Sequence, residues 1–195
     1  MTLPLDLTCS VPFTHNFLRG SNVSLKLMET SDACYLKALY DDVGWIMEGS
    51  SYTPKTEQQL QALITSASQR YSIEPRFTVQ NKSGDFVGVA KLYFTDTTSG
   101  VTYIAVAICT DHQRKGYGTE ANRLLVDYAI LHMNMRIVYA EVNGYNHPNI
   151  ELKKKEGWEL VATLPDRLIK FGQPYSLLIF SMTRDMWLTR TKLSL

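Results

Sequence analysis

The strongest constraint on the fold comes from one continuous stretch, residues 101–142. An apolar run, VTYIAVAI (101–108), is long enough to be a central strand, and a basic, glycine-spaced loop, QRKGYG (113–118), follows it. The next residues, TEANRLLVDYAILHM (119–133), have the pattern of a helix, and IVYAEV (137–142) has that of another strand. The stretch therefore predicts a strand–loop–helix–strand unit in which the glycines stand directly before the helix.

The rest of the chain predicts further strands and helices around this unit. Thr56 and Gln59 form a capping-box pattern, and the turn NKSGD (81–85) joins two strands as a hairpin. We expect strands at 22–28, 77–80, 86–94, 158–164 and 175–183, and helices at 30–40, 56–71 and 146–156. This order predicts a mixed α/β (α+β) fold, a largely antiparallel sheet of about seven strands flanked by helices.

Length and composition indicate one globular domain over residues 1–195, with an irregular segment at 1–20 and a core at 22–187. The chain is 45% hydrophobic and 20% charged, which is ordinary for a globular domain of this size. The net charge of only +1 argues against nucleic acid or an anionic membrane as a partner. The apolar runs are also far shorter than the roughly 20 residues of a spanning helix.

The cysteines indicate the compartment. Cys9, Cys34 and Cys109 are odd in number and widely spaced, which fits reduced thiols better than a disulfide framework. The first residues lack the basic region and continuous apolar core of a signal peptide. We therefore expect a cytoplasmic protein.

The loop before the helix has the chemistry of a phosphate site. Gly116 and Gly118 remove side chains where a phosphate would approach the backbone, and the helix that follows directs its unpaired N–H groups and positive dipole end there. Arg114 and Lys115 add positive charge, and Thr119 offers a hydroxyl. Two such glycines also occur in a plain turn, so the context has to decide.

Two other interpretations of the same glycines fit less well. G-Y-G-T-E-A (116–121) matches the dinucleotide fingerprint, but seven residues separate it from the strand and too little chain remains for a doubly wound sheet. K-G-Y-G (115–118) also opens like an RNA-recognition octamer. That octamer continues as a strand with stacking aromatics, whereas this chain continues as a helix without them.

The chain resembles the GNAT superfamily of acetyl-CoA-dependent N-acetyltransferases. Residues 113–118 match its signature Q/R-x-x-G-x-G/A, FVGVAKL (86–92) looks like its third strand, and EVNGYNHPNIELKKKEGWELV (141–161) is similar without gaps to its E-V-x-x-x-N-x-x-A-I-x-L-Y-E-K-x-G-F segment. The resemblance covers most of residues 22–187. It looks closest to the branch with ribosomal-protein, polyamine and antibiotic acetyltransferases, partly through SMTRDMW (181–187).

The resemblance implies acetyl-CoA as the acyl donor and a set of cofactor-binding residues. The end of the strand would bind the pantetheine arm as an added strand and orient the thioester carbonyl, and the loop would hold the pyrophosphate. Asn146 matches a family asparagine that hydrogen-bonds the cofactor, although an asparagine there also suits a helix N-cap. The positions are Val106, Ala107, Ile108, Gln113, Arg114, Lys115, Gly116, Tyr117, Gly118, Thr119 and Asn146.

The resemblance also implies two catalytic positions. Glu141 matches a general base, and at the end of a buried strand its pKa would be raised by desolvation. Lys153 stands where many members have a tyrosine that protonates the leaving thiolate; the run 153–155 also fits a solvated last helical turn. A thiol with a pKa of about 8.5 leaves without much help. Tyr139 and Tyr145 are nearby substitutes.

The acceptor is the least constrained part. A loop with Trp45, Glu48 and Tyr52 lies where the family builds its acceptor pocket, and acidic and aromatic groups there suit a cationic amine. The expected activity is direct acetyl transfer to an amine of a small molecule or protein, without a metal, since His112 and His147 lack metal-ligand spacing. The alternative is a catalytically weak or inactive acyl-CoA-binding sensor or interaction module. The resembling family also implies a possible homodimer.

Overall fold

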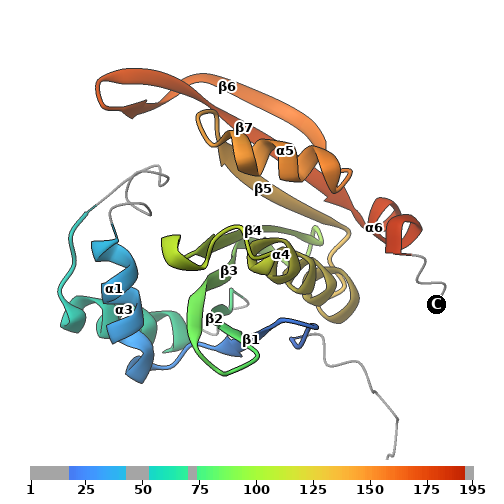
Figure 1. Ribbon diagram of the computed structural model, residues 1–195. Helices are drawn as coiled ribbons and strands as arrows, with labels where there is room; N and C mark the ends of the chain where they lie inside the picture. The colour runs from blue at the N-terminus through green and yellow to red at the C-terminus, as the bar shows by residue number, and fades with distance from the viewer. Residues whose placement is uncertain (1–17, 43–52, 70–73, 192–195) are drawn as a thin grey trace, which may run out of the picture.

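The computed structural model describes residues 18–42, 53–69 and 74–191 of the chain. A seven-stranded mixed sheet runs through it in the order β1-β2-β3-β4-β5-β7-β6, as Figure 1 shows. β4 and β5 pair in parallel and the other neighbouring pairs are antiparallel, so the predicted fold class is confirmed. The strands are β1 (Val23–Leu27), β2 (Arg76–Asn81), β3 (Phe86–Asp96), β4 (Val101–Ile108), β5 (Ile137–Asn143), β6 (Glu159–Lys170) and β7 (Gln173–Thr183).

Helices cover both faces of the sheet. A 3-10 turn, η1 (Thr30–Asp32), leads into α1 (Ala33–Asp41), and α3 (Glu57–Gln69) begins at the predicted capping box, in which Gln59 N donates to Thr56 Oγ1 (3.2 Å) and Thr56 N donates to Gln59 Oε1 (2.8 Å). A second 3-10 turn, η2 (Thr110–His112), precedes α4 (Tyr117–Asp127). The chain continues as the π-helix η3 (Tyr128–His132), then as α5 (His147–Lys155) and α6 (Arg184–Thr191).

Two apolar clusters divide the core between the faces. Val89 and Ala90 are neighbours on β3 and therefore point to opposite faces of the sheet. Ala90 belongs to the larger cluster, which α4 covers with side chains such as Leu125. Val89 packs against the smaller cluster formed by α1 and α3, which includes Leu36. The sheet is thus a middle layer whose second face, under α1 and α3, is separate from the face under α4.

The main differences from the prediction concern β6, α4 and α6. β6 extends to Lys170, not to residue 164, because a register shift between Leu164 and Leu168 lets the strand continue past Pro165 in the long β6–β7 hairpin. The helix predicted at 119–133 begins two residues earlier and ends as η3. No element was predicted for α6, although its Trp187 is fully buried and donates through Nε1 to Asp127 Oδ1 (2.7 Å).

Candidate active site

β4 and β5 separate midway along the sheet. The pairing joins Val101–Tyr103 of β4 to Ile137–Tyr139 of β5. Beyond Tyr103, β4 continues to Ile108 and pairs with β3 but not with β5 (Figure 1). Backbone groups alternate in direction along a strand. Cys109 N donates to Val87 O of β3 (3.0 Å), so alternation turns the backbone groups of Ile108 and Val106 the other way, toward the side that β5 has left. Strand β4 therefore presents an open hydrogen-bonding edge.

The glycine loop lies at the end of this open edge. Gln113 Nε2 donates to Ile108 O (3.2 Å) and so fixes the loop to the last residue of β4. Gly116 has φ of 81°, a left-handed conformation that favours glycine, and it stands at the N-cap of α4 without a side-chain cap. The first intrahelical bond runs from Glu120 N to Gly116 O (3.1 Å). The N–H groups of residues 117–119 are left without an intrahelical acceptor.

The other loop residues surround this helix N-terminus. Thr119, predicted as the loop's last residue, belongs with Tyr117 and Gly118 to the first turn of α4. Arg114 is exposed and has φ of 60°, whereas Lys115 Nζ donates to Asp111 O (2.9 Å) across η2. The loop thus combines the dipole end of a helix with an exposed arginine and a tethered lysine, an arrangement suited to anionic phosphate groups.

Glu141 lies on β5 in a cluster of aromatic side chains. Tyr93 on β3 donates its hydroxyl to Glu141 Oε2 (3.3 Å), and Tyr103 stands between Tyr93 (ring centroids 5.5 Å apart) and Tyr139 (5.1 Å). Burial and the charge of Glu141 raise the pKa of Tyr93, so its hydroxyl stays a donor. The expectation that Glu141 is desolvated was wrong, since its side chain is exposed.

Strand register explains why Tyr93 and Tyr103 were missed. The two residues pair across the β3–β4 hairpin, and Tyr103 pairs in turn with Tyr139 of β5. Neither carries a motif signal. The alternation in β3 and β4, together with the hairpin register, was the signal that could have placed them beside Glu141.

Lys153 is buried, contrary to its reading as part of a solvated helical turn. Its exposed fraction is 4%, and its Nζ donates to Asn122 Oδ1 of α4 (2.7 Å) and lies 4.0 Å from the ring centroid of Trp158. Asn122 Nδ2 donates in turn to Glu156 Oε2 (3.0 Å), which is also buried. Burial lowers the pKa of Lys153 to about 8, and burial raises that of Glu156. Lys154 is exposed, so the solvated reading holds for that neighbour.

Asn146 is the N-cap of α5. Its Oδ1 accepts from Asn149 N (3.2 Å), the usual capping bond, with Pro148 in the first turn. Nearby, Tyr145 receives a bond from Asn143 Nδ2 (3.0 Å) and packs edge-on to Tyr175 (5.0 Å). The hydrogen bonds of Asn146 and Asn143 both stabilise the local structure. Cofactor binding by Asn146 stays a prediction.

The predicted acceptor residues Trp45, Glu48 and Tyr52 lie outside the described residues. The residue that follows α1, Asp42, is bound to η2. Its carboxylate accepts from Thr110 N (3.1 Å) and from Thr110 Oγ1 (2.8 Å). The end of α1 is therefore tied to the segment that leads from β4 into the glycine loop.

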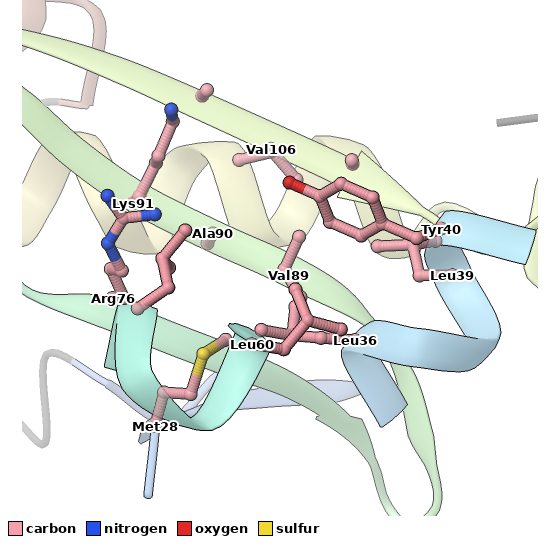
Figure 2. Close-up of a pocket in the computed structure, with 13 residues that line it drawn as sticks. Met28, Leu36, Leu39, Tyr40, Leu60, Arg76, Val89, Ala90, Lys91 and Val106 are labelled. Atoms are coloured by element: carbon pink, nitrogen blue, oxygen red, sulfur yellow. The ribbon is translucent and has the colours of Figure 1, made fainter. Parts of the chain in front are cut away.

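A cavity of about 180 Å³ lies between α1, α3 and the sheet (Figure 2). β4 contributes Ala105, Val106 and Ala107 to its wall, so it adjoins the open end of that strand. The remaining lining is mostly aliphatic. Figure 2 shows the side chains of Arg76 and Lys91 together on one side and the ring of Tyr40 on the other.

Two features are absent from the described residues. None of the helices in residues 18–42, 53–69 and 74–191 is long and apolar enough to cross a membrane. Within the same ranges, His, Cys, Asp and Glu side chains form no group of three or more that could hold a metal ion.

Comparison with known proteins defines the family. The domain described as "Acetyltransferase (GNAT) domain" matches residues 23–159, most of the chain. An uncharacterized N-acetyltransferase, p20 of Bacillus licheniformis, is 24% identical over 171 residues, covering 86% of this chain and 96% of that protein. The chain belongs to the GNAT acetyltransferase family.

Solved structures show the same fold. The spermidine N-acetyltransferase of Vibrio cholerae in complex with CoA and spermine superposes with a TM-score of 0.81 at 17% identity, over 87% of this chain and 99% of that one. A dodecameric structure of that enzyme gives 0.77 at 19% identity, over 88% and 99%. The family and fold confirm the predicted class of enzyme, an acyltransferase that moves an acetyl group to an amine.

Proposed function

We propose that the chain is a cytoplasmic N-acetyltransferase, folded as one domain, that uses acetyl-CoA and the open edge of β4 for direct transfer to a small amine. The observation that carries the proposal is the continuity between that edge and the capless N-terminus of α4, joined by the bond from Gln113 to Ile108. The unpaired cysteines Cys34 and Cys109 agree with a reducing compartment.

Each part of the edge has a role in holding the donor. Val106 and Ile108 offer backbone groups to the pantetheine arm, and the first turn of α4 offers N–H groups to the pyrophosphate, with Arg114 adding charge. The backbone of Ala107 points to β3, so this residue serves as a wall of the cavity. The amide of Asn146 has a further lone pair for the cofactor beside its capping bond.

The chemistry requires that an amine lose a proton, that an oxyanion be stabilised and that a thiolate leave. Acetyl-CoA supplies an activated acetyl group as a thioester. Glu141, oriented by Tyr93, accepts the amine proton directly or through water. In this proposal the outward N–H of Val106 donates to the oxyanion. Lys153 is engaged with Asn122 and Trp158, which supports a role in holding α5 against α4 over a role as proton donor.

The proposed function is tested by calorimetric titration with acetyl-CoA, then by thiol release over an amine panel with mass spectrometry of the products. We expect micromolar binding and release of CoA thiol with at least one amine. Binding without turnover on any amine, protein N-termini included, would contradict the enzymatic proposal and favour a sensor. Light scattering of the same samples measures the assembly, for which we propose a homodimer; the structurally similar spermidine N-acetyltransferase of Vibrio cholerae forms a dodecamer.

A further inference from the structure

The cavity beside β4 has an apolar body and a cationic end. Met28, Leu36 and Leu60 form its aliphatic wall beneath the ring of Tyr40, while Arg76 of β2 and Lys91 of β3 stand side by side at the other end, as Figure 2 shows. The two cations are paired residues of the β2–β3 ladder, so the sheet itself holds them adjacent. The described residues that line the cavity include no carboxylate.

Neither cation forms a close ion pair within the part of the chain that the structure describes. Its ion pairs involve other residues, so neither Arg76 nor Lys91 is paired with a described carboxylate. Glu74, which lies nearby, accepts from Thr95 N (3.1 Å). Burial, and next the charge of Arg76, lower the pKa of Lys91, against smaller opposing effects of Glu74 and Glu141. The site therefore keeps two like charges together at a cost that a bound anion would offset.

The cationic end is connected to the proposed base. Lys91 Nζ lies 4.7 Å from the centroid of the Tyr93 ring, and the Tyr93 hydroxyl donates to Glu141. An anion on Lys91 therefore lies close to the group that would take a proton from the amine. The opposite wall, formed by Ala105, Val106 and Ala107, is the strand proposed to hold the acetyl thioester.

We propose that this cavity selects a small acceptor amine with an apolar side chain and a carboxylate next to the amine, as in an aliphatic or aromatic α-amino acid, and discriminates against polycations. The apolar wall takes the side chain, Arg76 and Lys91 take the carboxylate, and the amine is left between Glu141 and β4. A volume of about 180 Å³ is below the roughly 300–1,000 Å³ of drug-sized sites, so the acceptor is small. The inference rests on the proposed function and adds its substrate class.

The test compares matched amines. Acetyl transfer to leucine and phenylalanine is measured against isoamylamine and phenethylamine, which lack only the carboxylate, and against spermidine. We expect kcat/KM at least roughly 10-fold higher for the amino acid of each pair, the size of one charge-assisted hydrogen bond. Lys91→Met should remove that preference, by raising KM for leucine and phenylalanine several-fold more than KM for isoamylamine and phenethylamine. Lys82→Met, in the exposed β2–β3 turn, is the control and should keep it.

The outcomes separate the two proposals. Preference for spermidine, or equal rates with and without the carboxylate, would overturn the substrate class and leave the proposed function standing. If acetyl-CoA binds but no amine is acetylated, the proposed function fails, and the cavity is judged by calorimetry of N-acetylleucine with CoA-loaded protein. Binding that Lys91→Met removes and Lys82→Met keeps would then support the anion site, and absence of binding would overturn it.

Discussion

The Tyr93 hydroxyl on β3 donates to the Glu141 carboxylate on β5, across β4, at 3.3 Å. The contact spans the point where β4 and β5 separate, since Tyr103 and Tyr139, the last paired residues of those strands, pack beside it. Because Tyr93 keeps its proton, it fixes the orientation of an otherwise exposed carboxylate. A base held at the opening of the sheet is the arrangement that the predictions below examine.

Glu141→Gln should lower kcat by about 100-fold or more, since a positioned general base contributes roughly 10²–10⁴. The acetyl-CoA dissociation constant should stay within about twofold, because Glu141 lies outside the donor-binding edge. Tyr93→Phe should give a smaller loss in kcat, as it removes only the orienting bond. Steady-state kinetics and calorimetry measure both, and an unchanged kcat in Glu141→Gln would remove this residue from the mechanism.

Gly116→Ala should weaken acetyl-CoA binding as well as lower the free energy of unfolding. A non-glycine residue at φ of 81° costs about 1–2 kcal/mol. Gly84 is a matched control, because its φ is 86° and, as at Gly116, an added Cβ meets nothing within 4 Å. Urea unfolding should show similar losses for the two variants, while calorimetry should show weaker binding for Gly116→Ala alone. Equal affinities would mean that the loop is only a turn.

Lys153→Met should change how stability depends on pH. Burial lowers the folded-state pKa of Lys153 to about 8 from the usual 10.5, so between these values the unfolded chain binds more protons. Stability of the natural chain should therefore rise with pH in this window, by about 1–2 kcal/mol from pH 7.5 to 9.5 relative to Lys153→Met. Urea unfolding at both pH values measures the difference. The exposed Lys154→Met serves as the control and should follow the natural chain.

Asn146→Ala should destabilise the protein by about 1 kcal/mol through loss of the α5 cap. Asn146→Ser should restore most of that stability, because a hydroxyl also caps a helix. If the amide binds the cofactor as well, acetyl-CoA affinity should fall in both variants. Affinity that recovers together with stability in Asn146→Ser would show that the residue acts as a cap alone. Thermal unfolding and calorimetry on the same samples separate the two roles.

Local signals in the sequence predicted most of the scaffold. The capping box of Thr56 and Gln59, the β2–β3 hairpin and the loop around Gly116 each depend on neighbouring residues, and the structure has all three. Lys153 was misread because a run of lysines at a helix end is usually solvated. Its burial depends on Asn122 and Trp158, which only the packing of α5 on α4 brings together.

The acceptor side was the least predictable for the same reason. Arg76 and Lys91 are 15 positions apart and meet through the β2–β3 register, while Tyr93 reaches Glu141 across a third strand. Neither relationship has a local motif. The length of β6 depended on a register shift that no single residue announces.

The separation of β4 and β5 divides the sheet into two antiparallel blocks, β1–β4 and β5–β7–β6, which share only three residue pairs. In the proposed binding mode the donor's arm lies along the free edge of β4 and bridges the blocks. Ligand that binds only the folded state adds to its stability by mass action. The free energy of unfolding would then rise with the cellular concentration of acetyl-CoA, so that an enzyme short of its donor is also the more easily unfolded and degraded one.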